Sequence, residues 1–494
     1  MDTFIKNYWS LYNDFLLKFE KLTYKGFSLA YLCHLPSFVS TNRELWNKLY
    51  DPKFIKYIEH EVQHQKEIQA KFNQFVLHHT KKRSNEHNPK GKVVVHIDKL
   101  LRFPQSTFIN YFDAKHTIIL VSSEKKAKLM KNKMSILQTP SIDGSTARKK
   151  YHVPAKGINQ ITTIPLNRYY SNIDGEIAKI KQQAIVILDS YKNHYVFGMS
   201  SFREWLLLKL HAVMNRIIMS KSFFEDNAVS CIIVSTTHSY INRILAVVAA
   251  EKGIPTICMQ HGIMSSELGY IPKIATIDAV YGQFEKDWYE KLGVSGSSIK
   301  IIGHPRFDQA YQKPKLTRDQ FYRKLTLDRN KKTILFVVRG DKHVDRWSLL
   351  IKELSKHHHV NILIKNYPSN KDHPLVREFP FVFSTKGLDL YNIFPHVDVV
   401  VAYSSTVALE AMLAEKHVFI LKDDFEGYTN YFANLGNIVQ SDPNQLAPYI
   451  AKYLSRPHFR EEVENRRKNF LQYAYPQTKK SNDRLKELIE KLTI

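Results

Sequence analysis

Four polar clusters in this chain follow short apolar runs and contain residue types that bind anions or move protons. They are Gln260-His261-Gly262, Gly303-His304-Pro305-Arg306, Lys365 with Tyr367-Pro368, and Ser404-Ser405-Thr406 with Glu410. Each apolar run has the length and β-branched composition of a buried strand. Because ligands of open parallel sheets bind beyond the carboxyl ends of the strands, we expect these side chains to line a binding cleft.

The hydroxyl cluster from Ser404 to Thr406 lies at the predicted start of a helix. One hydroxyl at that place is explained by helix capping alone. Three in succession also offer donors to a phosphate group, which the helix dipole favours. Glu410 follows Thr406 by one helical turn on the same face, where its carboxylate would accept hydrogen bonds from sugar hydroxyls.

Two cationic residues, Arg339 and Lys365, also stand where predicted strands end. An exposed lysine in a loop is usually only solvated. Two cations at the ends of neighbouring strands would instead face one cleft and neutralise a diphosphate.

His261 is the strongest candidate for acid–base chemistry, because histidine titrates near neutral pH and Gly262 after it lets the backbone approach a ligand closely. A histidine satisfied within the core is the alternative interpretation. Asp98, at the end of the run VVVHID, is a second candidate base. His304 precedes Pro305, and a proline there also simply fixes a turn.

The elements that must position these residues alternate between strand-like and helix-like segments from about residue 90 onward. That alternation predicts parallel sheets with crossover helices. Residues 1–85 are instead helical in pattern, and we interpret their aromatic stripe as core packing. The segment from Lys82 to Lys92 is a predicted linker, and the polar segment from Gln312 to Asn330 is the predicted hinge between two α/β domains.

The chain has 494 residues and a formal net charge of +25, with basic residues densest from Lys125 to Lys156. This charge suits phosphorylated substrates or an anionic membrane surface. Nucleic acid is not an expected partner, because the sequence shows neither a reading helix nor a basic face interleaved with aromatics.

The three cysteines, the lack of a signal-peptide pattern and the lack of an apolar run of about 20 residues predict a cytoplasmic protein. Peripheral attachment to the inner face of the cell membrane is the alternative. The chain also contains neither a Walker A loop nor G-x-G-x-x-G after a strand, which excludes an ordinary ATPase or dehydrogenase. The histidines at 357–359 and the pair Asp423-Asp424 lack spaced partners, so no metal site is predicted.

The segments MQHG, AVYGQFEKDWYEKLGV, IIGHPRFD, ILIKNYPSN and DVVVAYSSTVALEAMLAEKHVFI follow one another between about residues 229 and 421. This series resembles the bacterial capsule, spore-coat and teichoic-acid group of GT-B glycosyltransferases, which includes CDP-glycerol glycerophosphotransferases. The resemblance implies an α/β fold of GT-B type, with two Rossmann-like domains facing a cleft. Residues 90–312 would form the acceptor domain, residues 325–455 the nucleotide-donor domain, and helices in 456–494 would pack back across both.

The resemblance also implies roles for the clusters. The hydroxyls of Ser404, Ser405 and Thr406 would bind the donor phosphate, Glu410 the ribose, and Arg339 and Lys365 the phosphates, while His261 would face the reacting centre. Gln260, Gly262, His304, Arg306 and Pro368 would complete the cleft. Enzymes of this fold generally need no catalytic metal and no cofactor beyond the activated donor.

The expected activity is transfer of a sugar from a nucleotide-activated donor to a surface polysaccharide or lipid-linked acceptor, with His261 or Asp98 as the base. Three alternatives remain open: a CDP-glycerol or polyol-phosphate phosphotransferase, an enzyme similar to sugar-nucleotide 2-epimerases, and a non-catalytic scaffold for polysaccharide assembly.

Overall fold

The computed structural model describes residues 1–81, 91–129, 161–356, 360–367, 369, 371–423, 425–476 and 480–493. Several residues of the sequence predictions lie outside these ranges. They are Pro368, Asp424, the histidines at 357–359, residues 82–90 of the predicted linker, and the part of the basic stretch from Lys131 to Lys156.

In the described part of the chain, a first sheet of seven parallel strands has a Rossmann-like order. From edge to edge it contains β5 (Thr162–Pro165), β4 (Thr117–Val121), β3 (Lys92–His96), β6 (Val229–Val234), β7 (Thr256–Met259), β8 (Ile277–Val280) and β9 (Ile299–Ile301). Its central strands are runs of valine, isoleucine and cysteine that are buried throughout, as strands covered on both faces require.

A second parallel sheet of six strands is built from the described residues between 332 and 440. Its order is β12 (Val382–Ser384), β11 (Val360–Asn366), β10 (Lys332–Val338), β13 (Val399–Tyr403), β14 (His417–Leu421) and β15 (Val439–Gln440). Both sheets begin in the middle, add strands to one side, and then continue on the other side of the first strand. This order is that of a doubly wound fold.

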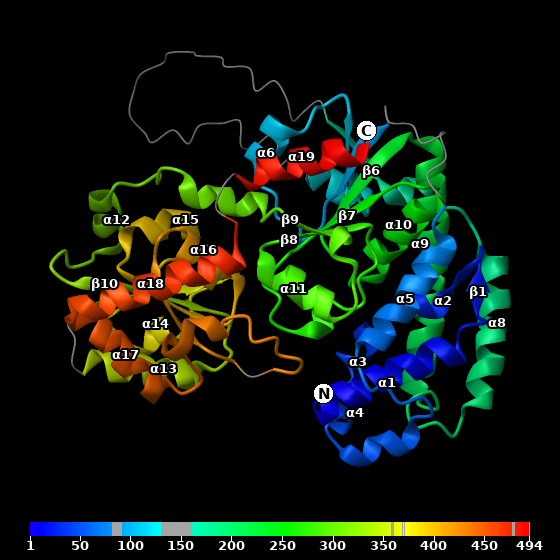
Figure 1. The fold of residues 1–494 in the computed structure, drawn as a ribbon, viewed down its shortest axis with the longest axis horizontal. Helices are drawn as coiled ribbons and strands as arrows, with labels where there is room; N and C mark the ends of the chain where they lie inside the picture. Colours follow the sequence, from blue (N-terminus) through cyan, green and yellow to red (C-terminus); the bar gives the residue numbers. More distant parts are fainter. Residues whose placement is uncertain are drawn as a thin grey trace.

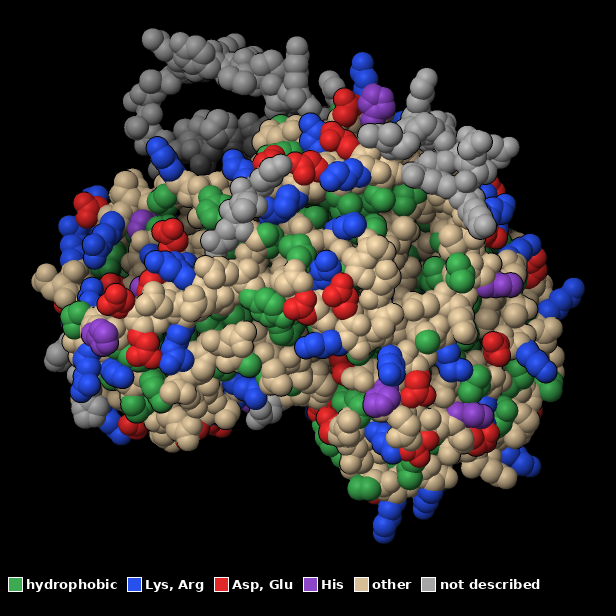
Figure 2. All heavy atoms as spheres, viewed as in Figure 1, with side chains coloured by type: hydrophobic (Ala, Val, Ile, Leu, Met, Phe, Trp, Pro, Cys, Tyr) green, Lys and Arg blue, Asp and Glu red, His purple; other side chains and the backbone are tan. Residues whose placement is uncertain are grey.

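The two sheets form two lobes that lie side by side (Figure 1). The predicted fold class, two Rossmann-like domains of GT-B type with an N-terminal helical region, is confirmed. None of the helices within the described ranges is long and apolar enough to cross a bilayer. On the face shown in Figure 2, Lys and Arg side chains are spread over both lobes and interspersed with Asp and Glu.

The N-terminal region consists of helices and one short hairpin, β1 (Thr23–Tyr24) with β2 (Phe27–Ser28). Its helices are α1 (Thr3–Lys18), α2 (Leu29–Cys33), α3 (Pro36–Val39), α4 (Arg43–Lys48), η1 (Pro52–Tyr57) and α5 (Lys66–His79). They pack on the first domain, where α2 and α5 contact helices α9 and α10. The aromatic side chains Trp9, Tyr12 and Phe15 of α1 are buried in that shared core, as their interpretation as core residues expects.

The crossover helices of the first domain cover both faces of its sheet. They are α6 (Gln105–Tyr111), η3 (Leu166–Tyr169), α8 (Asp174–Ser190), α9 (Ser200–Asp226), α10 (Tyr240–Glu251), η4 (Glu267–Gly269), α11 (Gln283–Lys291), η5 (Gly296–Ser298) and η6 (Pro305–Tyr311).

The second domain begins earlier than the hinge prediction implies. Helix α12 (Arg318–Leu325) lies within the predicted hinge, but Phe321 and Tyr322 are buried in the core of the second domain. The connection between the domains is therefore limited to about residues 312–317. The other helices of this domain are α13 (Val344–Ser355), α14 (Pro374–Glu378), α15 (Leu390–Ile393), η7 (Phe394–His396), α16 (Thr406–Leu413), η8 (Ala433–Ile438) and α17 (Pro443–Ser455).

The last two helices link the domains. Helix α18 (Pro457–Ala474) packs on α17 of the second domain and on α11 of the first. Helix α19 (Ser481–Thr493) lies beside α6 on the first domain, where Leu485 and Leu488 join the core under the sheet (Figure 1).

Candidate functional site

A cleft of about 390 Å³ lies between the carboxyl ends of the two sheets. Loops after β3 and β7 of the first domain line one side, and loops after β10 and β13 of the second domain line the other. Residues of the sequence prediction that line it are His261, Gly262, Arg339, Ser404, Ser405, Thr406 and Glu410. The structure thus brings together residues as much as 149 positions apart in the sequence.

The second-domain wall of this cleft lies at the point where the strand order reverses. Strand β10 pairs with β13 on one side and with β11 on the other. Arg339 directly follows β10, and Ser404 directly follows β13. Ligands of open α/β sheets bind in the crevice at this reversal, because the loops and helix N-termini on its two sides diverge there.

The hydroxyls of Ser404 and Ser405 are buried, and neither has a hydrogen-bond partner of good geometry among the residues that the structure describes. Ser405 is the N-cap residue of α16, yet its side chain makes no capping bond. Capping therefore does not explain these hydroxyls. Buried polar groups without partners are rare, and at the start of a helix they are placed to bind an anion.

The Thr406 hydroxyl joins the two domains. Its oxygen accepts a hydrogen bond from the backbone N–H of Ile263 at 3.0 Å. A Cβ added to Gly262 would lie 3.3 Å from the same oxygen, tighter than most side-chain contacts, so a residue without a side chain suits this approach. The helix tip and the loop that contains His261 are therefore in direct contact.

His261 follows β7 and lies half-buried, with its ring stacked on Tyr270 at a centroid distance of 5.6 Å. Burial lowers its pKa to about 4, while nearby Asp98 acts in the opposite direction and Arg102 adds to the lowering. The imidazole is therefore neutral near pH 7 and able to accept a proton. The Ser235 backbone, like Asp98, favours the charged ring and so opposes the fall in the pKa of His261.

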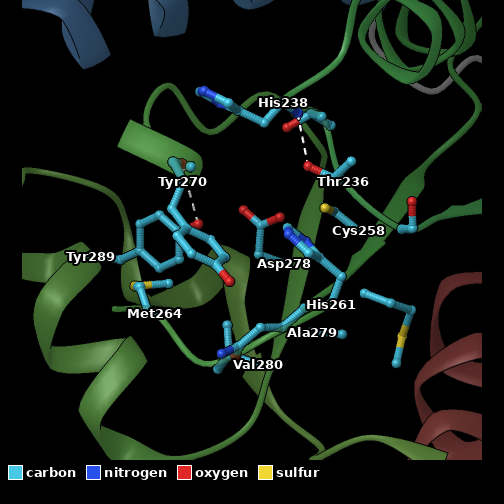
Figure 3. A pocket seen from close by; sticks show the side chains of 15 residues that line it. Thr236, His238, Cys258, His261, Met264, Tyr270, Asp278, Ala279, Val280 and Tyr289 are labelled. Carbon is cyan, nitrogen blue, oxygen red and sulfur yellow. Dashed lines mark hydrogen bonds between the residues drawn. The ribbon is translucent and has the colours of Figure 1, made fainter. Parts of the chain in front are cut away.

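A second, smaller cavity of about 20 Å³ lies behind His261, large enough for a single water molecule. The side chains of His261, Asp278 and Tyr270 line it (Figure 3). Burial raises the pKa of Asp278, and the nearby ammonium group of Lys273, 3.6 Å away, opposes that rise.

Asp98 lies at the corresponding reversal point of the first sheet, between β3 and β6, but it is not among the described residues that line the cleft. Its carboxylate accepts hydrogen bonds from the Ser235 hydroxyl, the Asn242 amide, and the backbone N–H groups of Leu100 and Leu101. Burial raises its pKa, but these hydrogen bonds outweigh burial and hold the pKa below its usual value. Asp98 thus stabilises the loop that begins with it.

Gln260 holds the His261 loop from within the first domain. Its amide donates to the Glu285 carboxylate at 2.9 Å and to the Gly262 carbonyl at 2.8 Å, and its oxygen accepts from the Tyr281 backbone at 2.8 Å. Burial raises the pKa of Glu285 to about 7. The side chain of Gln260 lines the small cavity and not the interdomain cleft.

Glu410 and Arg306 form a buried ion pair between elements of the two domains, with Nη2 of Arg306 2.8 Å from Oε1 of Glu410. The other oxygen of Glu410 accepts from the Tyr391 hydroxyl. Nε and Nη1 of Arg306 are buried, with no hydrogen-bond partner in the described part of the chain. Glu410 lines the cleft, but both of its oxygens already contact protein donors.

Besides Asp98 and Gln260, further predicted residues lie away from the cleft. Lys365 ends β11 as expected, but it is buried, and its ammonium donates to the Leu388 carbonyl at 2.6 Å. His304 is buried at the N-cap of η6, where its Nδ1 accepts from the Arg306 backbone at 3.0 Å, and burial holds its pKa well below the usual value. Neither is among the described residues that line the interdomain space, and Arg306, which was predicted to complete the cleft, is not among them either.

The cleft also contains residues that the sequence prediction missed. Arg102, Tyr270 and Tyr403 line it, and Lys342 and His343 line an adjoining hollow of about 350 Å³. Tyr367, from the predicted cluster with Lys365, lines the cleft as expected. The two spaces share Ser265, Ser266, Arg339, Tyr403 and Ser404. Lys342 and His343 lie shortly after Gly340 in the loop that follows β10. Arg339 was predicted because it stands where this strand ends, and the same reasoning applies to these two residues.

A bridge between two loops joins the domains beside this space. Ser266 pairs with Tyr428 of the second domain, and the Glu267 N–H donates to the Gly427 carbonyl at 2.9 Å. The Glu267 carboxylate in turn accepts from Trp9 at 2.6 Å and Gln65 at 2.7 Å. The N-terminal helical region therefore supports a loop at the cleft. Within the described ranges, no three His, Cys, Asp or Glu side chains gather as metal ligands would.

No family model and no curated protein matches the chain, whereas solved structures with a similar fold do. The chain is similar in structure to the UDP-GlcNAc 2-epimerase of Neisseria meningitidis bound to UDP-GlcNAc (10% identity, 81% of this chain and 100% of that chain, TM-score 0.48). It is also similar to a glycosyltransferase of Rickettsia africae ESF-5 (12% identity, 82% of this chain and 98% of that chain, TM-score 0.48). A third similar structure is the glycosyltransferase of kitacinnamycin (11% identity, 82% of this chain and 99% of that chain, TM-score 0.49). At these values the likeness concerns the fold.

Proposed function

We propose that this protein is a glycosyltransferase that moves a sugar from a nucleotide-activated donor to an acceptor hydroxyl. The observation that supports it best is the pair of buried, unpartnered hydroxyls on Ser404 and Ser405, next to Arg339 and across the cleft from His261. The serine hydroxyls and the arginine suit a phosphate on one side of the cleft, and the histidine on the other side can accept a proton.

On this proposal the donor phosphates lie at the start of α16. The two serine hydroxyls and the free N–H groups of the helix donate to the phosphate oxygens, and the helix dipole favours their charge. The Arg339 guanidinium, exposed in the cleft, adds a bidentate contact.

The reaction follows from that arrangement. The neutral imidazole of His261 takes the proton of the acceptor hydroxyl, whose oxygen bonds to the anomeric carbon of the donor. The bond between that carbon and the phosphate oxygen breaks, and the nucleotide leaves with the electron pair. Arg339 and the helix start stabilise the negative charge that develops on the leaving phosphate, and such stabilisation supplies a large part of catalysis in acyl and phosphoryl chemistry.

The proposed acceptor is a surface polysaccharide or a lipid-linked glycan. The proposed location is the cytoplasm, with peripheral attachment to the inner face of the cell membrane. A polyol-phosphate transferase would use the same phosphate site. A sugar-nucleotide epimerase would use it too, but it must exchange a proton on a sugar carbon and needs no acceptor.

The test is incubation of the protein with radiolabelled UDP-, CDP-, CMP-, GDP- and dTDP-linked compounds, each with and without a glycan acceptor fraction. Label that enters the acceptor and depends on His261 supports the proposal, with His261→Gln as the variant and Arg168→Gln, an exposed residue outside the cleft, as the control. A changed sugar nucleotide formed without acceptor would instead identify an epimerase.

A further inference from the structure

The acidic residues that line the interdomain space are already neutralised by protein cations. Among the described lining residues they are Glu410 and Asp423. Glu410 is paired with Arg306 at 2.8 Å, and Asp423 with Arg346 at 3.1 Å. Neither carboxylate therefore offsets other positive charge in the cleft.

Arg102, Arg339 and Lys342 line the same space, and all are exposed. As far as the structure is described, none of them forms an ion pair. Their uncompensated positive charge indicates a ligand with several negative groups, because a cleft lined by positive charge concentrates anions.

These cations belong to two different walls. Arg339 and Lys342 follow β10 in the second domain, close to the hydroxyls of Ser404 and Ser405, so they match the two phosphates of a nucleotide-activated donor. Arg102 follows β3 in the first domain. It remains available for a second anionic group on the side of the cleft where the acceptor would bind.

The loop that presents Arg102 is held in a defined conformation. The Asp98 carboxylate accepts from the backbone N–H groups of Leu100 at 2.8 Å and Leu101 at 3.1 Å. Arg102 itself has φ 51°, a left-handed conformation that non-glycine residues rarely adopt. Such backbone persists where surrounding contacts enforce it, and it is concentrated at ligand sites. Electrostatic repulsion from Arg102 contributes to the low pKa of His261, which places the guanidinium near the proposed base.

We propose that Arg102 binds a phosphoryl group of the acceptor, so that the enzyme selects an anionic acceptor whose phosphate lies near the hydroxyl that reacts. This inference rests on the proposed function for the identity of the two substrates. The phosphoryl group has two chemical sources: the diphosphate of a lipid carrier, or a phosphodiester within a soluble polymer. The competing assignment is that Arg102 reaches across the cleft to the donor phosphates.

Glycerol 3-phosphate is the probe that separates these assignments. Its binding is measured by equilibrium dialysis to the full-length protein, alone and saturated with the nucleoside diphosphate that binds best. We expect glycerol 3-phosphate to bind in both states and glycerol not to bind. Arg102→Gln should weaken glycerol 3-phosphate binding roughly 10-fold or more, the effect of losing a charge-assisted hydrogen bond, while Arg168→Gln should leave it unchanged. Arg102→Lys should retain part of it, because the charge remains.

The inference is overturned if wild-type protein does not bind glycerol 3-phosphate, if Arg102→Gln binds it as well as wild type, or if nucleotide displaces it. It is also overturned if Arg102→Gln weakens nucleotide binding as much as Arg339→Gln does. If no nucleotide binds at all, the proposed function fails, whereas glycerol 3-phosphate binding still reports on Arg102.

The two sources of the phosphate are distinguished with radiolabelled donor and two acceptors, a polyprenyl diphosphate-linked sugar in detergent micelles and a soluble polyol phosphate oligomer. Each is compared with an uncharged analogue, an alkyl glycoside of the same sugar for the first and the free polyol for the second. We expect the uncharged analogues to be poor acceptors, and the phosphate-containing acceptor that supports transfer identifies the source. Equal use of the phosphate-containing acceptors and their uncharged analogues would contradict the inference.

Discussion

The Thr406 hydroxyl oxygen of the second domain lies 3.0 Å from the backbone nitrogen of Ile263 in the first domain. This hydrogen bond joins the start of α16, where the donor phosphate is proposed to bind, to the loop that holds His261. This hydrogen bond therefore links the two halves of the proposed reaction directly, beside the other contacts between the domains.

Replacing Thr406 with valine removes the acceptor of this bond at nearly constant shape. The Ile263 N–H would then be left without a partner, which costs about 1–3 kcal/mol. We expect urea unfolding of Thr406→Val to show a loss of this size, and Thr406→Ser, which keeps the hydroxyl, to show much less. Equal stability of the valine and serine variants would show that the contact contributes nothing.

The double variant Ser404→Ala/Ser405→Ala separates a structural role of these hydroxyls from a binding role. Because both are buried without a partner among the described residues, their removal should leave the free energy of unfolding of the ligand-free protein unchanged within about 0.5 kcal/mol, or raise it. Thermal unfolding without ligand measures this. A marked loss of stability would mean that the hydroxyls have protein partners and support the helix start.

The ion pair between Arg306 and Glu410 is the main buried charge pair beside the cleft. Arg306→Met leaves the Glu410 carboxylate buried without its cation, and breaking such a pair costs about 3–5 kcal/mol. The second change Glu410→Met should recover part of that loss, because no charge then remains unpaired. If the double variant were less stable than Arg306→Met, the pair would not be the reason for the loss.

The low pKa of His261 sets the pH dependence of the proposed reaction. The imidazole accepts a proton only when neutral, so kcat/KM should fall with acid around pH 4, where this group titrates, and not near its ordinary value of about 6.5. His261→Gln should abolish most of the transfer. An acid limb near pH 6.5 that depends on His261 would contradict the burial of this ring.

The low pKa of His261 also makes the stability of the folded protein depend on pH. Between about pH 6.5 and 4 the unfolded chain binds a proton at His261 that the folded protein does not, so the free energy of unfolding falls as the pH is lowered through this window. Urea unfolding at several pH values should show a shallower fall for His261→Gln than for wild type.

The fold and much of the cleft could be predicted from the sequence, because both depend on where strands end. The buried runs before His261, Arg339 and Ser404 are long enough to mark their carboxyl ends, and parallel pairing then brings these ends to one edge. The hydroxyl cluster could be found for the same reason.

Side-chain direction could not be predicted in this way. Arg339 follows β10 and Lys365 lies at the end of the neighbouring strand β11, but the Lys365 ammonium is directed to the Leu388 carbonyl, a partner 23 residues away that no local pattern reveals. Gln260 is likewise held by Glu285. Arg102 was missed because its place in the cleft depends on a left-handed turn four residues after Asp98, and no glycine marks that turn.

The central claim is that the cleft between His261 and the start of α16 binds a nucleotide-activated donor, and calorimetric titration with UDP, CDP, GDP, dTDP and CMP tests it most directly. At least one of these should bind to wild-type protein, and the affinity should fall by roughly 10-fold or more in Arg339→Gln and in Ser404→Ala/Ser405→Ala, as expected when charge-assisted hydrogen bonds to phosphate are lost, while Arg168→Gln binds as wild type does. Absence of binding by all five, or equal binding by wild type and both cleft variants, would contradict the claim.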